Sequence, residues 1–344
     1  MALIEVLAPQ MTAYSKQFHT DGDVEWSPYV MFFHPRNYHS TVVSTDSSGF
    51  RFSELDRNRY SITSSSELSS ARLIAGNSVV FGIGASSDKA TIASRMMVHD
   101  SRQEPWLNFG GRAFNSAQEL ILITLYRHML PKINEIILFS GANNLFLARL
   151  PEIHIQEHGA FYNSWRFFDT INGENSFSFS SFFNKRQKYI RPVTYPENTR
   201  SLDERIRLAA ELTLRHLDGW NALAKDMEAK LTFVLQPVSG WVRNKGCKEE
   251  EALLLELNNR PQWTTVQKDV LQNEVCERYA SILETGAHSK GISFVNISPA
   301  LREAANDDQW LFIDHTHLTD EGYDLVARLV LNCTEGKQQM SKMR

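Results

Sequence analysis

The sequence is poor in cysteine and has no excess of positive charge, no long apolar run and no internal repeat. Its three cysteines show no CxxC spacing, which argues against a disulfide framework or a zinc site and favours reduced thiols. A net charge of -4 without a Lys/Arg stripe argues against nucleic-acid binding. No apolar run approaches the roughly 18 residues that cross a membrane, and the first residues have no signal-peptide pattern. We therefore expect a cytoplasmic protein with no nucleic-acid partner and no membrane span.

Short apolar runs alternate with amphipathic segments from residue 71 onward. The apolar runs are continuous rather than alternating, which is typical of parallel strands covered on both faces. The candidate strands are residues 71–76, 106–110, 135–141, 231–237 and 292–297. The candidate helices, several of which begin with Ser, Asp or Asn, are residues 86–97, 115–130, 201–230, 265–288 and 320–332. The pattern predicts a three-layer α/β/α fold with a five-stranded parallel sheet.

Three stretches fall outside this alternation. Residues 1–70 are polar and mixed and end in the serine-rich SITSSSELSS, so we predict an N-terminal extension that packs on a core domain at 71–340. Residues 151–200 are rich in aromatic side chains without a period, and they predict either a cover for the core or a lid over an apolar substrate. Residues 238–264 contain Gly, Pro and a KEEE run, which we interpret as an excursion with a solvated helix face.

Four strand ends carry the residues that could do chemistry, because active sites of open parallel sheets form where strands end. Ser78 follows the first strand, and the glycines after it make only GxG, too little for a dinucleotide site. A glycine-rich turn, GGRAFNS, follows the second strand, and Asn143 and Asn144 follow the third. Asp314 and His317 precede the last helix. Each feature alone is also typical of an ordinary turn or helix cap.

The order of the four blocks resembles the SGNH (GDSL-type) hydrolase superfamily over roughly residues 71–333. The block GNSVVFGIGASSD at 76–88 looks most like the branch that reads GGSTxFGxGASSD, and YHSTVVSTDSSGFR at 38–51 resembles an element that often precedes it. A closer kinship with a bacterial group described as inducers of phenazine production is also suspected. The resemblance implies a flavodoxin-like sheet topology and an acyl-cleaving site that needs no cofactor.

The resemblance assigns roles to individual residues. Ser78 falls on the nucleophile, His317 on the general base and Asp314 on the carboxylate that orients this base. The oxyanion donors fall on the backbone N–H groups of Ser78 and Ala113 and on the side-chain amide of Asn143.

Two positions depart from the family pattern. Ala113 stands where a glycine is usual, so we expect a methyl group that narrows the pocket and a backbone conformation suited to L-residues, with Gly111 as the alternative donor. Asn144 replaces an aspartate that is usually structural. The remaining candidates for the substrate pocket are Asn77, Gly111, Arg112, Asn144 and His315.

The sequence DHTH could instead describe a metal site, since Asp314, His315 and His317 could supply three ligands. The i, i+2 spacing of the histidines suits a strand face better than a loop, and HExxH spacing is absent, so we expect no metal here. We interpret His315 as a loop residue near the pocket and Asp320 as the N-cap of the last helix.

Together these residues predict a serine hydrolase that cleaves acyl ester or thioester bonds through an acyl-enzyme. An acyltransferase is the first alternative, because water and another acceptor compete for the same intermediate. The departures at Ala113 and Asn144 keep open a second alternative, a catalytically silent binding or regulatory protein of this fold. The expected partner is a small-molecule acyl substrate, free or bound to a carrier protein, and a homo-oligomer is compatible with the sequence.

Overall fold

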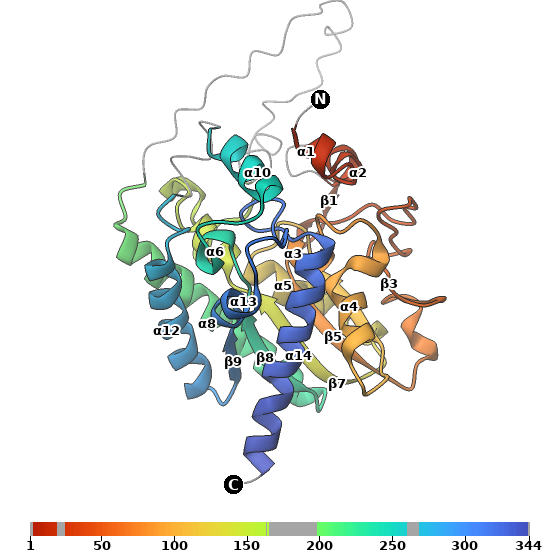
Figure 1. Cartoon of the computed structure of the whole chain (residues 1–344). Helices are drawn as coiled ribbons and strands as arrows, with labels where there is room; N and C mark the ends of the chain where they lie inside the picture. Colours follow the sequence, from red (N-terminus) through yellow and green to blue (C-terminus); the bar gives the residue numbers. More distant parts are fainter. Residues whose placement is uncertain (1–2, 19–24, 163, 165–197, 260–267, 343–344) are drawn as a thin grey trace, which may run out of the picture.

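A computed structural model describes residues 3–18, 25–162, 164, 198–259 and 268–342 (Figure 1). Its central sheet has five strands, all parallel: β5 (Ser70–Gly76), β6 (Trp106–Gly110), β7 (Lys132–Ser140), β8 (Lys230–Leu235) and β9 (Ser293–Asn296). The spatial order is β6-β5-β7-β8-β9. Numbered along the chain this is 2-1-3-4-5, the order of flavodoxin-like sheets. The predicted fold class is confirmed.

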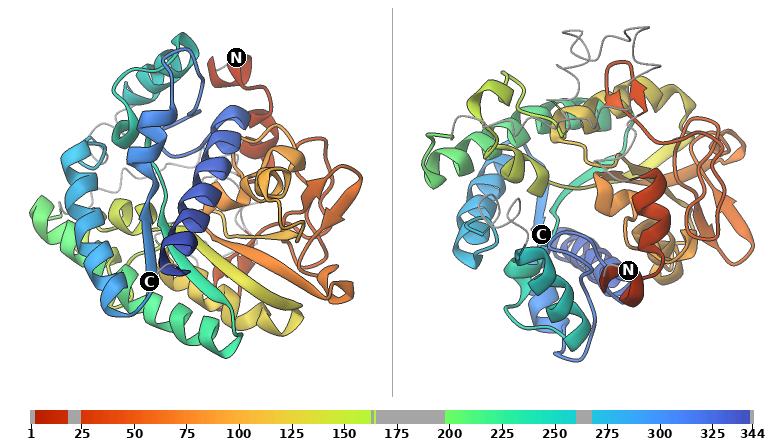
Figure 2. Two further views of the ribbon diagram at one scale, coloured as in Figure 1. Left: turned by 60° about the horizontal axis from the view of Figure 1, so that its bottom comes forward. Right: turned by 90° about the horizontal axis from the view of Figure 1, so that it is seen from above.

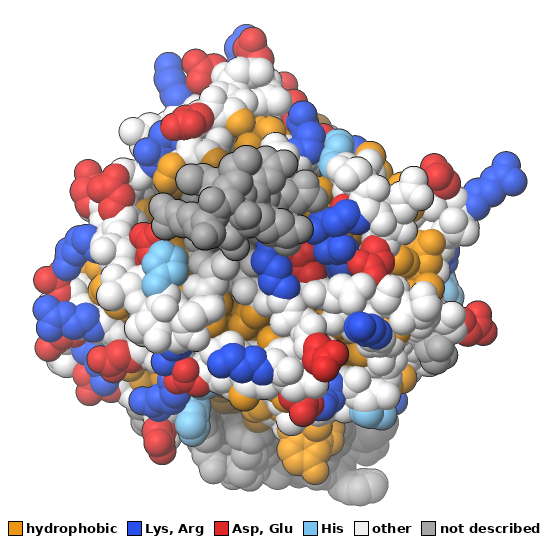
Figure 3. Space-filling model, turned by 90° about the horizontal axis from the view of Figure 1, so that it is seen from below, with side chains coloured by type: hydrophobic (Ala, Val, Ile, Leu, Met, Phe, Trp, Pro, Cys, Tyr) orange, Lys and Arg blue, Asp and Glu red, His pale blue; other side chains and the backbone are white. Residues whose placement is uncertain are grey.

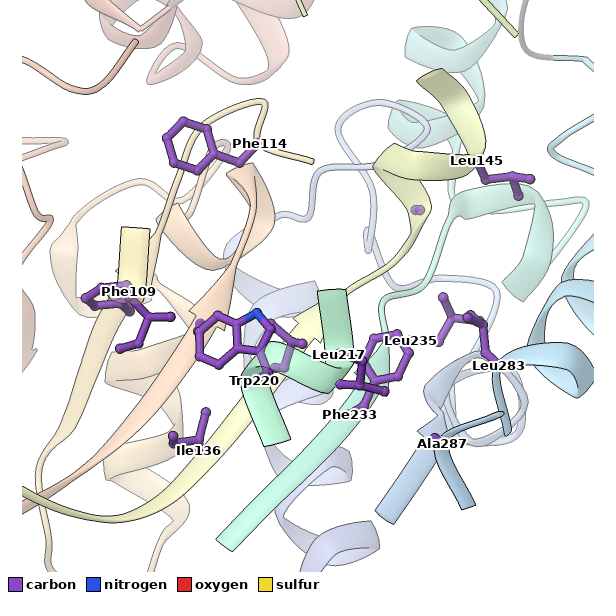
Figure 4. Packing of buried hydrophobic residues seen from close by; sticks show 14 of the residues in the cluster. Phe109, Phe114, Ile136, Leu145, Leu217, Trp220, Phe233, Leu235, Leu283 and Ala287 are labelled. Carbon is purple, nitrogen blue, oxygen red and sulfur yellow. The ribbon is translucent and has the colours of Figure 1, made fainter. Parts of the chain in front are cut away.

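Helices cover both faces of the sheet, as Figures 1 and 2 show. On one face Leu73 and Ala75 of β5 belong to a core that also includes Leu122, Trp220 and Leu283. The helices of this layer are α5 (Ser116–Tyr126), α8 (Leu202–Asp226) and α12 (Asn273–Ser289). Figure 4 shows Trp220 of α8 in the middle of this packing.

The opposite face has a second core. Ile74 of β5 and Ile137 of β7 pack there with Met96, Leu301 and Val326. The helices of this layer are α4 (Ile92–His99), α13 (Ile297–Ala304) and α14 (Asp320–Lys342). Successive residues of β5 therefore enter different cores, which is why the strand reads as a continuous apolar run.

Most element boundaries differ from the predicted ones by a few residues. The helix predicted for 265–288 begins only at Asn273, with 265–267 outside the described residues, and the helix predicted for 320–332 continues to Lys342. The helix predicted for 86–97 is divided at Thr91 into the 3-10 turn Asp88–Ala90 and α4, because the Thr91 side chain caps α4 by accepting from Ser94 N–H. The predicted cap Asp320 is the first residue of α14, and the Thr319 hydroxyl accepts the N–H of Gly322 instead. Asp320 accepts the backbone N–H of Ser86 at 2.7 Å and so ties the last helix to the loop after Ser78.

The N-terminal residues pack from the carboxyl ends of the strands, the end viewed in the right panel of Figure 2, to the start of β6, where Ser53 Oγ donates to the carbonyl of Trp106 at 2.6 Å. They form α1 (Leu3–Leu7), α2 (Met11–Gln17) and two small antiparallel sheets, β1 (Trp26–Ser27) with β2 (Met31–Phe32) and β3 (Ser53–Leu55) with β4 (Asn58–Tyr60). The division into an extension and a core domain stays a prediction.

Residues 238–264 include α9 (Ser239–Val242) and α10 (Lys248–Asn258). The interpretation of KEEE as a solvated face is wrong for Glu250, which is 1% exposed. Its carboxylate pairs with Arg243 at 2.8 Å and accepts the backbone N–H groups of Leu311 and Phe312 at 2.9 and 3.0 Å. Glu250 therefore supports the segment that leads into Asp314.

The aromatic segment predicted as a cover or a lid lies largely outside the described residues, which include 151–162, 164 and 198–200 of it.

Among the helices that the structure describes, none is both long enough and apolar enough to span a membrane. Charges of both signs are mixed on the face at the amino ends of the strands (Figure 3).

Candidate active site

Ser78 lies at the carboxyl end of β5, in a turn that has no room for a side chain at Gly76. A Cβ atom on Gly76 would lie 2.1 Å from the carbonyl oxygen of Phe139 on the neighbouring strand, so only glycine fits there. Asn77 then caps the short helix α3 (Ser78–Phe81) by accepting the N–H of Val79 at 3.1 Å. Ser78 is the first residue of α3 and keeps 9% of its surface exposed.

His317 reaches Ser78 from the loop before α14. Its Nε2 lies 2.8 Å from Ser78 Oγ, and its Nδ1 lies 2.6 Å from Asp314 Oδ2. Because the carboxylate is an acceptor, Nδ1 carries the proton, and Nε2 presents its lone pair to the serine hydroxyl. This is the arrangement in which an imidazole can take a proton from a serine.

Backbone hydrogen bonds hold the carboxylate of Asp314 in place beside His317. Its Oδ1 accepts the backbone N–H groups of Thr316 and His317 at 2.8 and 2.7 Å. Burial would raise the pKa of Asp314, but its interactions with His317 and with these N–H groups outweigh burial and hold the pKa well below the ordinary value. Asp314 therefore stays ionised and can stabilise a positive charge on His317.

Three strand-end loops meet beside Ser78. The N–H of Gly111, after β6, donates to the carbonyl of Gly76 at 2.8 Å. The side-chain amide of Asn143 belongs to α6 (Ala142–Leu147), after β7, and donates to the carbonyl of Phe114 at 2.7 Å. The first bond holds the second predicted block against the first, and the second bond holds the third block against the second.

Two backbone N–H groups in this region have no acceptor. In the described part of the chain, neither the N–H of Ser78 nor that of Ala113 forms a hydrogen bond. Gly111, the alternative donor, already uses its N–H on Gly76. Of the two second-block candidates, Ala113 is thus the one whose N–H is available to a developing oxyanion.

Ala113 corrects one expectation about the second block. Its φ is +58°, in the left-handed region that favours glycine, so its backbone does not have the conformation expected for an L-residue. This conformation costs an L-residue roughly 1–2 kcal/mol, and turn contacts such as the Phe114 N–H to Gly111 carbonyl bond at 3.1 Å accompany it.

Two predicted pocket residues have side chains that bond to other parts of the fold. Asn77 is fully buried, and its amide donates to Gln236. Asn144 donates to the hydroxyls of Ser116 and Thr213, of α5 and α8, at 2.6 and 2.8 Å. Their side chains are thus engaged in capping and packing, and a contact of either residue with the substrate stays a prediction.

His315 is likewise a support and not an open pocket residue. It is 5% exposed, with Nδ1 2.9 Å from Ser239 Oγ and Nε2 2.9 Å from Asn258 Oδ1. Burial lowers its pKa, although Asp314 acts in the opposite direction. The two histidines of DHTH thus engage different partners, and within the described chain no group of three metal-ligating side chains is present.

His34 stabilises the turn after β6, a role that no sequence motif predicted. Its Nε2 accepts the backbone N–H of Arg112 at 2.9 Å, so its Nδ1 carries the proton and donates to the carbonyl of Gly49 at 3.0 Å. Burial and the charge of Arg112 lower its pKa well below the ordinary value, which keeps the ring neutral. His34 therefore fixes the turn that carries Ala113.

A second support comes from Arg51, which the sequence also did not indicate. Its guanidinium pairs with Asp88 at 2.9 Å and donates to Tyr14 Oη at 2.9 Å and to the carbonyl of Gly82 at 2.8 Å. Tyr14 Oη donates in turn to the carbonyl of Ala85 at 2.6 Å. The loop after Ser78 is thereby held from the N-terminal side.

No protein-family model matches the chain, and no curated protein matches it. Among solved structures, it is similar to an extracellular lipase from Streptomyces rimosus, with 12% identity, a TM-score of 0.42 and coverage of 77% of this chain and 99% of the lipase. A lipase/acylhydrolase from Enterococcus faecalis has 12% identity, a TM-score of 0.41 and coverage of 78% and 96%. The acetyl xylan esterase AlAXEase has 10% identity, a TM-score of 0.41 and coverage of 76% and 98%. Likenesses this distant do not indicate an activity.

Proposed function

We propose that this protein is a serine hydrolase that cleaves acyl ester or thioester bonds through an acyl-enzyme. The observation that carries the proposal is the chain of contacts from Ser78 Oγ through His317 to Asp314, at 2.8 and 2.6 Å. His317 takes the proton from Ser78 as the serine attacks the acyl carbonyl, and Asp314 stabilises the imidazolium that results. His317 then returns the proton to the leaving group.

The oxyanion of the tetrahedral intermediate is held by the N–H groups of Ser78 and Ala113 and by the amide of Asn143. Both N–H groups lack an acceptor in the described part of the chain, which favours this assignment. Each such donor typically contributes about 3–4 kcal/mol to transition-state stabilisation. The departures at Ala113 and Asn144 therefore argue less strongly for a silent protein than the sequence alone suggested.

Transfer of the acyl group to an alcohol, amine or thiol uses the same residues up to the acyl-enzyme, and it stays an alternative for the second half-reaction. Membership of the SGNH superfamily, its GGSTxFG branch and the kinship with inducers of phenazine production are part of this proposal. A cytoplasmic location, a carrier-bound substrate and a homo-oligomer remain predictions from the sequence.

The proposal is tested by covalent labelling and turnover. The wild type is expected to react with a fluorophosphonate probe at Ser78 and to hydrolyse p-nitrophenyl acetate or butyrate. Ser78→Ala should lose both the label and the turnover. A wild-type protein that neither labels nor turns over any ester or thioester would contradict the proposal, and label on a different serine would contradict the assignment of Ser78.

A further inference from the structure

Two buried arginines lie near α3, and they differ in how their charge is compensated. Arg51 is fully buried and donates to Asp88, to Tyr14 and to backbone carbonyls. Arg112 is 4% exposed, yet its Nε and Nη1 have no hydrogen-bond partner among the described residues. Its guanidinium carbon lies 6.0 Å from the centre of the Phe18 ring.

A buried guanidinium without a counter-charge is costly, because burial removes its hydration, and no carboxylate of the described residues pairs with Arg112. Burial lowers the pKa of Arg112 to about 10, so the group still carries its charge near neutral pH. The Phe18 ring offers a cation–π contact that is worth far less than the lost hydration. Arg112 therefore has the hydrogen-bonding capacity and the charge to bind an anion from outside the described chain.

The place of Arg112 suggests which anion this is. Arg112 immediately precedes Ala113, whose backbone N–H has no acceptor in the described chain. The backbone N–H of Arg112 donates to His34 Nε2 at 2.9 Å. One short turn thus carries both an unpaired N–H and an unpaired guanidinium. The planar fork of a guanidinium matches the two oxygens of a carboxylate or phosphate.

We infer that Arg112 binds an anionic group of the substrate, so that the preferred substrate is an acyl ester or thioester that carries a carboxylate or a phosphate. This inference rests on the proposed hydrolase function. It assigns Arg112 to substrate selection, while Ala113 and Asn143 are assigned to the transition state.

The first experiment compares three p-nitrophenyl esters: the neutral pentanoate, the glutarate half-ester with a free carboxylate, and the 4-phosphonobutyrate. The wild type should favour one of the anionic esters in kcat/KM, and the favoured ester identifies the anion. Arg112→Met should lower the ratio of anionic to neutral kcat/KM by roughly 10- to 100-fold, the usual effect of losing a charge-assisted pair. Arg112→Lys, which keeps the charge without the fork, should give an intermediate ratio.

Arg127→Gln is the matched control for the loss of one positive charge. Arg127 is 39% exposed and pairs with the exposed Asp226, so the ratio should not change in this variant. An unchanged ratio in Arg112→Met, or a wild type that favours the neutral ester, would overturn the inference even if turnover itself supports the hydrolase.

A second readout does not depend on catalysis. Glutarate or methylphosphonate should raise the Tm of the wild type and of Arg127→Gln, but not that of Arg112→Met. If no ester is cleaved and this shift depends on Arg112, the hydrolase proposal fails and the anion site stands. If esters are cleaved but neither anion shifts the Tm in an Arg112-dependent way, the anion site fails and the hydrolase stands.

Discussion

Two serine–histidine pairs in this molecule have almost the same oxygen–nitrogen distance but very different surroundings. Ser78 Oγ lies 2.8 Å from His317 Nε2, and Ser116 Oγ lies 2.7 Å from His216 Nδ1. On the far side of His317 is the carboxylate of Asp314 at 2.6 Å. On the far side of His216, Nε2 is buried without a hydrogen-bond partner in the described chain.

This difference decides which histidine can act as a base. Burial, with the nearby His158 and Arg215, lowers the pKa of His216 to about 4, so this ring cannot readily take a proton from a serine. The Ser116 hydroxyl also accepts from Asn144 at 2.6 Å and lies at the start of α5. A short serine–histidine distance therefore does not by itself indicate a nucleophile. The two pairs are distinguished by whether a carboxylate accepts from the other nitrogen of the imidazole.

The largest expected effect separates the two serines. Ser78→Ala should lower kcat for p-nitrophenyl butyrate by roughly 10⁴- to 10⁶-fold. Ser116→Ala should keep kcat within about tenfold and cost roughly 1–3 kcal/mol of unfolding free energy, because Asn144 and His216 lose a buried partner. Steady-state kinetics and urea unfolding of both variants check this. A Ser116→Ala protein that is folded but inactive would reverse the assignment.

Removing the carboxylate behind His317 should make the first pair resemble the second. Asp314→Asn should lower kcat by about 10⁴-fold, because an amide neither fixes the tautomer nor stabilises the imidazolium. Asp320→Asn is the matched control at the start of the helix that follows this loop, since Asp320 bonds to Ser86 and not to the histidine. Equal losses of kcat in the two variants would mean that the loop, and not the charge on Asp314, matters.

The third-block amide should matter less than either triad residue. Asn143→Ala should lower kcat by roughly 10²- to 10³-fold with a small change in KM, as expected for a donor that acts in the transition state. Its neighbour gives a contrast, because Asn144→Ala should act mainly on the Tm through Ser116 and Thr213. A larger effect of Asn144→Ala than of Asn143→Ala on kcat would exchange the roles of the two residues.

The smallest effect concerns acid stability. His216 has a folded-state pKa of about 4, below the unfolded value of about 6.5, so the unfolded chain binds a proton first as the pH falls. Its contribution to stability is present above pH 6.5 and is lost between about 6.5 and 4. The fall in Tm over this range should be about 2–5 °C smaller in His216→Gln than in the wild type. An identical fall in Tm would show that His216 does not titrate on unfolding.

The alternation of apolar runs and amphipathic segments was sufficient to predict the five strands of the sheet and the four blocks at their ends. The strands could be predicted because each is buried on both faces, and the four strand-end blocks followed from the strands. The structure brings Ser78, His317 and Asp314 into contact, although 239 positions separate the serine from the histidine. Helix ends were less predictable, because Thr319 and Asp320 are both good caps and only the geometry separates them.

The supports of the site could not be predicted, because they depend on long-range contacts. His34 meets Arg112 across 78 positions, and Arg51 meets Asp88 across 37. Neither contact leaves a periodic trace in the sequence. Glu250 was misinterpreted for the same reason, since a run of four charged residues on a helix gives no sign that one of them faces the chain 61 positions later.

The bonds that join the first and last blocks also bear on the order in which the molecule assembles. Ser78 and His317 are 239 positions apart, and Tyr323 Oη donates to the carbonyl of Ile83 across 240. Contacts of such separation close a loop that contains most of the chain, so they form late and slowly compared with helices and neighbouring strands. A partly folded or partly synthesised chain would therefore contain the serine long before it has the base. Reactivity at Ser78 would then report completion of folding rather than its onset.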